Sequence, residues 1–301
     1  MFDLPENYKI KIINRYGETG KEWLENVDAI LGKYQKQFCL EDIQLIENLS
    51  INLVAFAKCD LYGDVIIKIG TPGPTALSEI NIMKYYSSQY VPKTYYSSIT
   101  DRVQVLERIF PGYCLKNLEN REERVKVFCD LSNHLLILAN GEQNFQTFEE
   151  NFKSKINYAY ENKATYSDLL SMIDTATNLY QKIKDLHLPK YILHNDLHHK
   201  NILKAKTSWK AIDPHGIIGE KVFEACNFIR SEIENVSLEK NTINKIVSLI
   251  SQYYKEDKQL ILEALYIYII EKIIFYTKNK ADVKRISYNV NICKELLKML
   301  K

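Results

Sequence analysis

Residues 194–203 read His-Asn-Asp-Leu-His-His-Lys-Asn-Ile-Leu, and residues 211–214 read Ala-Ile-Asp-Pro. This stretch places a carboxylate at Asp196, an amide at Asn201 five positions later, and a second carboxylate at Asp213, twelve positions after the amide. Phosphoryl transfer needs one carboxylate to orient and deprotonate the attacking hydroxyl, and an amide and a carboxylate to hold Mg²⁺ on the nucleotide phosphates. The spacing equals that of the kinase catalytic loop, His-x-Asp-(x)4-Asn with a downstream metal-binding Asp. The stretch therefore predicts a site for phosphoryl transfer.

The composition is that of an ordinary globular chain. Its 301 residues are enough for one large domain or two coupled lobes. The 40 Lys and Arg against 38 Asp and Glu leave a net charge of +2. Nucleic-acid binders usually carry a clear basic excess, so we expect no nucleic-acid partner. The longest apolar run, at 260–275, is interrupted by charged residues, and we expect a buried core helix there and no membrane contact.

Cysteine use predicts the compartment. The six cysteines are scattered and none forms a Cys-x-x-Cys pair, so neither a zinc ribbon nor a redox motif is indicated. The first residues lack the basic and apolar regions of a secretory signal peptide. Scattered cysteines of this kind are typical of reduced thiols, and we therefore expect a cytoplasmic protein.

Hydrophobic periodicity divides the chain into two parts of different character. The first part is expected to contain one or two helices over 7–38, three strands within 43–69, a helix over 75–86, and strands around 91–96 and 102–108. The second is expected to be mainly helical, with a helix over 166–187, short strands at 191–193, 202–204 and 209–212, and about four helices after residue 219. We therefore predict an α+β fold of two lobes joined near residues 107–112.

The residues at 194–203 and 211–214 resemble the aminoglycoside and hydroxyurea antibiotic resistance kinases, the streptomycin-type phosphotransferase branch of the protein-kinase-like superfamily. That branch typically shows His-Gly-Asp-Leu-His-His-Gly-Asn-Ile-Leu and then Ala-Ile-Asp-Pro. The resemblance extends to Tyr-Gly-Glu-Thr-Gly at 16–20, to Leu-Glu-Arg-Ile-Phe-Pro-Gly at 106–112, and to residues 219–230. Most of the chain is thus covered.

The resemblance implies a protein-kinase-like two-lobe fold, with a small N-terminal lobe of an antiparallel sheet plus a helix and a larger, mainly helical C-terminal lobe. We place a helical segment at 1–40, the N-terminal lobe at 41–109 and the C-terminal lobe at 110–301. The implied activity is that of a kinase that uses ATP and Mg²⁺ to phosphorylate a hydroxyl of a small acceptor. The acceptors implied are streptomycin-like aminoglycosides and hydroxyurea, so an antibiotic resistance enzyme is expected.

Carried over residue by residue, the resemblance assigns the nucleotide side of the site. Lys68 matches the lysine that contacts the α- and β-phosphates, and Glu79 matches its ion-pair partner. Glu107, Arg108 and Ile109 match the hinge whose backbone hydrogen-bonds adenine.

The same comparison assigns the catalytic side. Asp196 matches the catalytic base, and Asn201 and Asp213 match the metal ligands. His194 is expected to order the loop by hydrogen bonding without transferring protons, and His198 is expected to support it.

Glycine is scarce, with 10 in the chain, and the departures from the family pattern reflect this. Asn195 and Lys200 stand where the family has Gly, and His215 stands where Lys is common. The expected phosphate-covering loop, at 49–52, contains no glycine, so Ser50 is the expected side-chain substitute for backbone contacts to phosphate.

Alternative interpretations remain open on the sequence. His194 and His198 have the i, i+4 spacing of helical zinc ligands, although the surrounding strands leave no room for such a helix. A catalytically weak nucleotide-binding protein and a kinase of a metabolic amino alcohol or sugar are also possible. Besides Asp196, the acidic residues considered near the acceptor are Glu220, Glu224, Glu232 and Glu234. The tyrosines considered for its pocket are Tyr266, Tyr268 and Tyr276.

Overall fold

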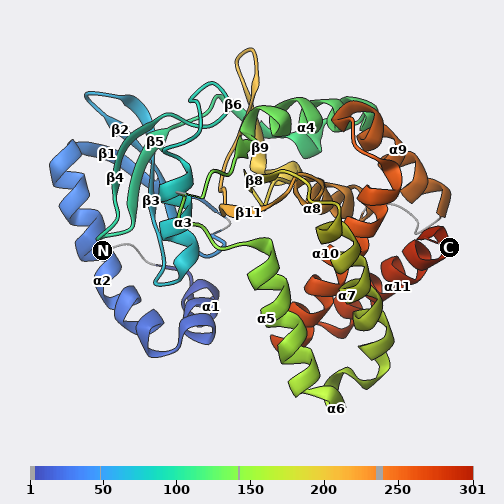
Figure 1. Ribbon diagram of the computed structural model, residues 1–301. Helices are drawn as coiled ribbons and strands as arrows, with labels where there is room; N and C mark the ends of the chain where they lie inside the picture. The colour runs from blue at the N-terminus through green and yellow to red at the C-terminus, as the bar shows by residue number, and fades with distance from the viewer. Residues whose placement is uncertain (1–3, 48, 142, 235–239, 301) are drawn as a thin grey trace. The chain divides into compact units, whose positions relative to one another are not determined.

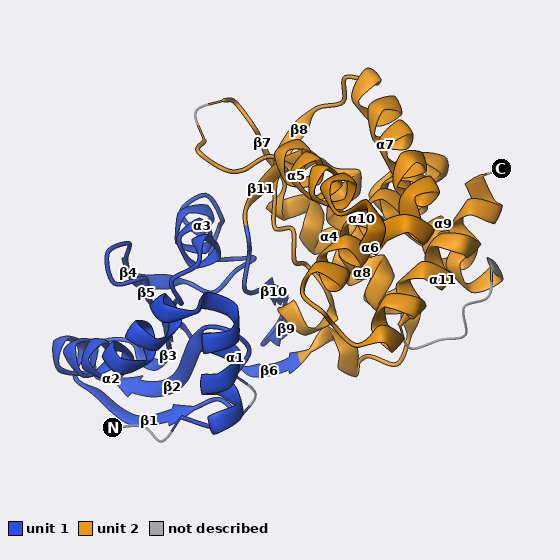
Figure 2. Ribbon diagram, turned by 90° about the horizontal axis from the view of Figure 1, so that it is seen from below, with its two compact units in different colours: residues 1–113, 203–215 blue, residues 114–202, 216–301 orange. Residues whose placement is uncertain are grey.

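A computed structural model describes residues 4–47, 49–141, 143–234 and 240–300. The chain forms two compact units: Met1–Tyr113 with Leu203–His215, and Cys114–Ile202 with Gly216–Lys301 (Figure 2). The three-part division at 1–40, 41–109 and 110–301 stays a prediction. The units differ from it because Leu203–His215, expected in the second lobe, folds with unit 1.

Unit 1 is built on a five-stranded antiparallel sheet of order β1-β2-β3-β5-β4 (Figure 1). Its strands are β1 (Leu40–Leu45), β2 (Leu53–Cys59), β3 (Gly63–Ile69), β4 (Thr94–Ser98) and β5 (Val103–Glu107). Helix α3 (Pro74–Ile82) lies between β3 and β4 in the chain, so the predicted order of three strands, a helix and two strands is confirmed. Strands β2 and β3 form a hairpin, and Gly63 adopts φ +72° where its turn enters β3.

Two helices precede the sheet, α1 (Glu6–Tyr16) and α2 (Glu18–Phe38), separated by Gly17. Their buried side chains recur at helical spacing and form one core cluster with alternate residues of the strands. The helical members of this cluster include Tyr8, Ile12, Trp23, Val27, Leu31 and Tyr34, and the strand members include Leu53, Ala55, Val65, Ile67, Ile69 and Val103. The predicted helical segment is therefore part of the core of unit 1.

A second, three-stranded sheet of order β10-β9-β6 comprises β6 (Pro111–Cys114), β9 (Ile202–Ala205) and β10 (Trp209–Ala211). From β10, Lys210 binds the carboxylate of Glu107 at the end of β5, with an Nζ–Oε2 distance of 2.6 Å. Ala211 also donates its N–H to the carbonyl oxygen of Tyr90. These contacts explain why 203–215 belongs to unit 1.

Unit 2 is mainly helical, and its centre is α10 (Lys258–Lys278), which is buried on nearly all sides. It packs against α5 (Phe148–Glu161), α7 (Leu170–Asp185), α8 (Val222–Ile233), α9 (Lys240–Tyr254) and α11 (Val283–Leu300) (Figure 1). The expectation of a buried core helix at 260–275 is thus confirmed, as are four helices after residue 219 in the part of the chain that is described. Helix α4 (Arg121–Leu135) packs on α9.

Two elements of unit 2 differ from the sequence-based expectation. The helix expected over 166–187 is divided into α6 (Lys163–Tyr166), a 3-10 turn at Ser167–Leu169 and α7. The apolar pattern is continuous through this turn, so periodicity alone does not reveal the break.

The expectation of helix from residue 219 misses β11 (Ile217–Glu220), which pairs with β8 (Lys190–Leu193) in a sheet of order β11-β8-β7, where β7 is Ile137–Leu138. A Cβ on Gly219 would lie 3.1 Å from Cβ of Phe148 and 3.2 Å from Cδ1 of Leu193. The glycine therefore marks a close approach of this strand to its neighbours.

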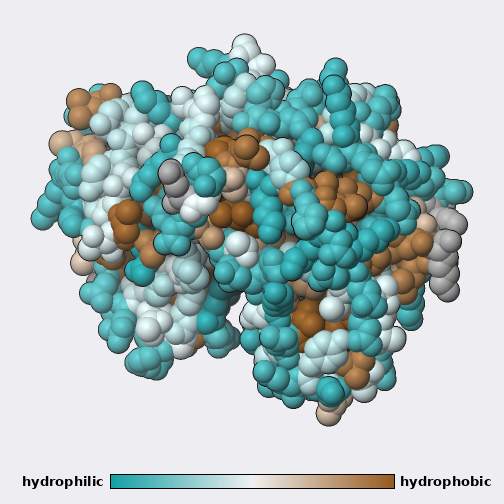
Figure 3. Space-filling view, in the orientation of Figure 1, coloured by the Kyte–Doolittle hydropathy of each residue, from teal (hydrophilic) through white to brown (hydrophobic). Residues whose placement is uncertain are grey.

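Among the described residues, no helix combines the length and the apolar composition needed to cross a bilayer. Figure 3 shows hydrophilic residues over most of the visible face, with hydrophobic residues in separate patches.

Candidate functional site

Unit 1 brings three of the predicted residues together around one ammonium group. Because side chains alternate along a strand, Lys68 on β3 points away from the face that carries Ile67 and Ile69. Its Nζ lies 2.6 Å from Oε1 of Glu79 on α3 and 2.6 Å from Oδ1 of Asp213. Lys68 and Glu79 are buried, whereas the side chain of Asp213 is 47% exposed.

The charges of this cluster explain its protonation state. Burial acts to lower the pKa of Lys68, but the Asp213 and Glu79 carboxylates outweigh it and raise the pKa above its ordinary value. Lys68 is therefore charged at neutral pH. Two carboxylates face a single ammonium, so the cluster has an excess of negative charge when both are ionised.

The donors of this cluster fit a magnesium ion that is also bound by phosphates. Mg²⁺ in nucleotide sites takes one or two protein carboxylates, with phosphate and water oxygens completing its octahedron. Asp213 offers such a carboxylate at the surface of unit 1, beside the buried Lys68–Glu79 pair. Within the described residues there is no group of three or more His, Cys, Asp or Glu placed to hold a metal ion by protein ligands alone.

Unit 2 places the predicted base in a set of amide donors. Asn201 donates through Nδ2 to the carboxylate of Asp196, 3.0 Å to Oδ2, and to its carbonyl oxygen, 2.9 Å. Asn227 on α8 donates to the other carboxylate oxygen, Oδ1, at 2.8 Å. Together the two donors fix the plane of the carboxylate. Asn201 and Asp213, predicted to hold one metal, belong to different units.

Asn227 was not identified from the sequence. Its Oδ1 accepts a hydrogen bond from Nη2 of Arg230, 3.3 Å, and this contact turns its Nδ2 toward Asp196. Arg230 is buried and also binds Glu234. Residues 227, 230 and 234 have i, i+3 and i+7 spacing on one helical face, which is the signal that could have identified this chain of contacts.

Hydrogen bonds fix the two histidines of the loop. His194 is fully buried, and its Nδ1 accepts the N–H of Asp196 at 3.3 Å. The role of His194 in ordering the loop stays a prediction. His198 accepts the N–H of Lys200 through Nδ1, which leaves its proton on Nε2, 3.8 Å from Oδ2 of Asp196. Burial lowers the pKa of His198, so the ring is neutral at pH 7.

The loop is not helical from residue 194 to residue 198, and the zinc-binding helix of the alternative interpretation does not form. Asn195 has φ +63°. Glycine adopts this left-handed conformation without strain, and Asn is among the few other residues that tolerate it. The departure from the family glycine at this position is therefore compatible with the same backbone.

Two buried carboxylates of α8 form hydrogen bonds to the loop at 194–203. Glu232 accepts hydrogen bonds from Nε of Arg124, 2.7 Å, and from Nε2 of His199, 2.6 Å. Burial acts to raise the pKa of Glu232, but Arg124 and His199 hold it at about 2. Glu224 accepts the N–H of Asn195 at 3.2 Å, and here burial prevails and raises the pKa to about 7.

Glu224 gives a testable dependence of stability on pH. Because its folded pKa of about 7 lies above the ordinary 4.5, the native state holds a proton that the unfolded state releases between these values. Ionisation of Glu224 therefore costs stability as the pH rises, by up to about 3 kcal/mol above pH 7. We expect Glu224→Gln, which mimics the protonated acid, to be more stable than the wild type by about 3 kcal/mol at pH 8 and by less than about 1 kcal/mol at pH 5. Urea unfolding at both pH values measures this, with the exposed Glu161→Gln as control, and a gain of equal size at pH 5 would exclude the titration.

Three of the four acidic residues considered for the acceptor are buried, namely Glu220, Glu224 and Glu232. Glu234 is exposed and binds Arg230. The tyrosines 266, 268 and 276 are likewise buried, and the hydroxyl of Tyr266 donates to the carbonyl oxygen of Met172. Core packing is thus the observed role of Tyr266.

The predicted hinge residues, Glu107, Arg108 and Ile109, lie at the end of β5. The N–H of Glu107 donates to the carbonyl oxygen of Lys93 and that of Arg108 to the carbonyl oxygen of Asp64, so both are used within unit 1. The Arg108 guanidinium lies over the ring of Phe56, 4.0 Å from its centroid. Ile109 is buried. Ser50 is exposed in the turn before β2.

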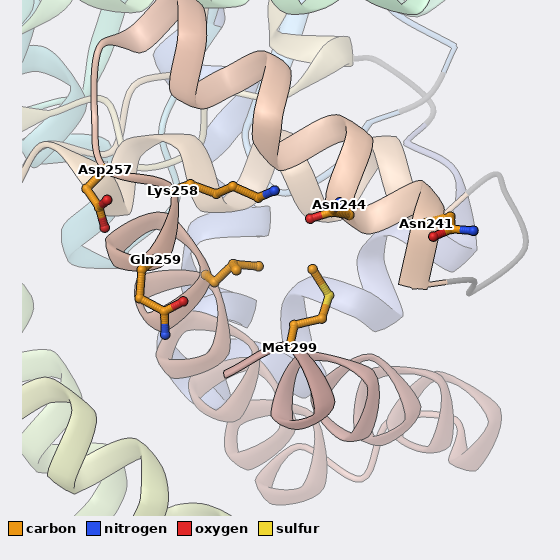
Figure 4. Close-up of a pocket in the computed structure, with 7 residues that line it drawn as sticks. Asn241, Asn244, Asp257, Lys258, Gln259 and Met299 are labelled. Carbon is orange, nitrogen blue, oxygen red and sulfur yellow. The ribbon is translucent and has the colours of Figure 1, made fainter. Parts of the chain in front are cut away.

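A pocket of unit 2 lies among α9, α10 and α11, and it contains none of the predicted site residues (Figure 4). Its lining is mostly polar: Asn241, Asn244, Asp257, Lys258, Gln259, Leu262 and Met299. Asp257 caps α10 by accepting the N–H of Leu260, so its carboxylate has a structural role.

Comparison with known proteins gives one family and one fold. The model of the family described as aminoglycoside/hydroxyurea antibiotic resistance kinase matches residues 66–278. A streptomycin 3''-kinase of Klebsiella pneumoniae is 53% identical over 36 residues, which span 12% of this chain and 14% of that kinase.

Solved structures of small-molecule kinases share the fold. An ethanolamine kinase of Plasmodium vivax has a TM-score of 0.65 at 13% identity, and the match covers 98% of this chain and 95% of that kinase. The choline kinase LicA of Streptococcus pneumoniae has a TM-score of 0.62 at 16% identity, and the match covers 92% of this chain and 99% of LicA. A thermostable mutant of the aminoglycoside phosphotransferase APH(4)-Ia, solved with ADP and hygromycin B, has a TM-score of 0.63 at 10% identity. The match covers 89% of this chain and 97% of the phosphotransferase. The predicted α+β kinase fold is confirmed.

Proposed function

Because the chain belongs to the aminoglycoside/hydroxyurea antibiotic resistance kinase family, we propose that it transfers the γ-phosphoryl group of ATP to a hydroxyl of a small acceptor. The observation that carries this proposal is the carboxylate of Asp196, held by amide donors from Asn201 and Asn227. A carboxylate fixed in orientation is what a base for a substrate hydroxyl requires.

Each residue then has a defined part. Asp196 accepts the proton of the acceptor hydroxyl, and Lys68, fixed by Glu79, binds the α- and β-phosphates. The N–H of Ile109 is the hinge donor that we assign to adenine, because those of Glu107 and Arg108 bond within unit 1. Asn201 and Asp213 would hold Mg²⁺, which neutralises charge on the phosphates during transfer.

For the acceptor we propose a streptomycin-like aminoglycoside or hydroxyurea, following the family. The neighbouring choline and ethanolamine kinases support an amino alcohol as the second candidate. We place the activity in the cytoplasm, where ATP is supplied and where the free cysteines stay reduced.

ADP production tests the proposal. The full chain with Mg-ATP is assayed against streptomycin, hydroxyurea, choline, ethanolamine and a set of sugars. Turnover of either of the first two compounds supports a resistance kinase, and turnover of only the others retains the kinase but replaces the acceptor. ATP binding without turnover of any acceptor favours a catalytically weak nucleotide-binding protein.

Asn227 provides a test of the base. We expect Asn227→Ala to lower kcat by roughly 10-fold, because one hydrogen bond to an ionised group, worth about 1.5 kcal/mol or more, no longer fixes the carboxylate. The Kd for ATP should not change. Steady-state kinetics and calorimetry measure both quantities, with Asn162→Ala at the end of α5 as the control. A weaker Kd for ATP with an unchanged kcat would contradict a positioning role.

A further inference from the structure

Helix α1 contacts the loop at 49–52, which contains no glycine, at three consecutive carbonyl groups. Nζ of Lys11 donates to the carbonyl oxygens of Leu49 and Ser50, each at 3.1 Å. One helical turn away, the hydroxyl of Tyr8 donates to the carbonyl oxygen of Ile51 at 2.7 Å. The carbonyl groups of residues 49, 50 and 51 therefore all face α1.

Because the peptide bond is planar, the direction of each of these carbonyl groups fixes the direction of the N–H group that follows it. In a trans peptide the C=O of one residue and the N–H of the next point in opposite directions. The cis peptide bond recorded in the described chain is elsewhere, between Phe110 and Pro111. The N–H groups of Ser50, Ile51 and Asn52 therefore point away from α1. No described residue accepts a hydrogen bond from any of the three.

The loop lies at the same end of the sheet as the lysine cluster. Leu53, which follows the loop, pairs with Ile69, the residue after Lys68. Oδ1 of Asn52 accepts the N–H of Thr71, 3.2 Å, and ties the loop to the segment after β3. Successive backbone N–H groups on one side of a turn form an anion-binding site, and here they accompany a charged lysine.

We propose that Lys11 is a positioning residue that makes the loop at 49–52 a phosphate-binding loop, in which the N–H groups of Ser50, Ile51 and Asn52 donate to the nucleotide phosphates. Glycine normally supplies this backbone geometry, and here the ammonium of Lys11 imposes it from outside the loop. Its charge also polarises the same peptide groups and strengthens their N–H donors. The inference rests on the proposed function and deepens it, because it replaces the expected Ser50 hydroxyl by backbone donors.

Further contacts hold α1 and α2 on the neighbouring segment. Oγ1 of Thr71 donates to the hydroxyl oxygen of Tyr16 at 3.0 Å, and Nε1 of Trp23 donates to the carbonyl oxygen of Gly70 at 2.9 Å. These helices are thus fixed to unit 1 independently of Lys11. Since the side chain of Lys11 is exposed, its removal leaves the core intact.

The test separates phosphate binding from adenine binding. Calorimetry gives the Kd of ATP and of adenosine for the wild type, Lys11→Ala, Lys11→Arg and the control Lys9→Ala, whose lysine is on the same helix and pairs with Glu6. We expect Lys11→Ala to weaken ATP about 10-fold, as for the loss of hydrogen bonds to a charged group, with adenosine unchanged. The KM for ATP should rise more than kcat falls. Lys11→Arg should recover most of the affinity, and Lys9→Ala should match the wild type.

Three other results would contradict either the role of Lys11 or the proposed function. ATP affinity in Lys11→Ala equal to that of the wild type overturns the proposal for Lys11 and leaves the kinase standing. An equal loss for ATP and adenosine also overturns it, because Lys11 would then support unit 1 as a whole. A wild type that binds neither compound contradicts the proposed function itself.

Discussion

Asp196→Asn is expected to reduce kcat by roughly 10³-fold, because an amide cannot accept the proton of the acceptor hydroxyl and general-base contributions are of this order. The substitution preserves the shape of the side chain, and its amide oxygen still accepts one of the two hydrogen bonds that Asn201 and Asn227 donate to Asp196. The free energy of unfolding should fall by about 1 to 3 kcal/mol at most, and the Kd for ATP should change little, which distinguishes lost chemistry from lost structure. Steady-state kinetics on the acceptor identified by the ADP assay, with calorimetry for ATP, measure these quantities.

The matched control is Asp130→Asn, which changes an exposed aspartate of α4 in the same unit. It should behave as the wild type in both measurements. Unchanged turnover in Asp196→Asn would remove Asp196 from the role of base. A large loss of ATP affinity would instead place its carboxylate on the nucleotide.

Lys68→Met is expected to abolish useful ATP binding and also to destabilise the protein by about 3 to 5 kcal/mol, because a buried carboxylate loses its partner. Glu79 is 4% exposed and would have to protonate or stay buried as an uncompensated charge. Since protonation becomes easier in acid, the loss of stability should be smaller at pH 5 than at pH 8. Urea unfolding at the two pH values measures the effect.

Two further variants make this prediction specific. The double variant Lys68→Met with Glu79→Gln removes both charges, so it should recover most of the stability without recovering ATP binding. Lys58→Met breaks the exposed pair with Asp42 on the same sheet and should cost less than about 1 kcal/mol. A Lys68→Met variant as stable as Lys58→Met would show that the Lys68–Glu79 contact does not compensate a buried charge.

The sequence predicted the elements whose signals are local. The strands of the first sheet follow apolar alternation and the Gly63 turn, and α10 follows a long apolar run. The continuous apolar pattern concealed the break between α6 and α7, and the short strand β11 resembled the start of the following helix. The strand depends on packing partners far along the chain, such as Phe148 against Gly219.

The site also combines residues with a local sequence signal and residues that only distant contacts identify. The spacing at 194–203 and 211–214 by itself predicted a site for phosphoryl transfer, and the roles predicted for individual residues stay predictions until the variants are measured. The contacts of Asn227 with Asp196 and of Lys11 with the loop at 49–52 were decided by tertiary structure. Motif residues are fixed by the chemistry that their side chains perform, so their spacing is visible in the sequence. Residues that orient them act across 31 and 38 positions, and only the folded chain brings such residues within hydrogen-bonding distance.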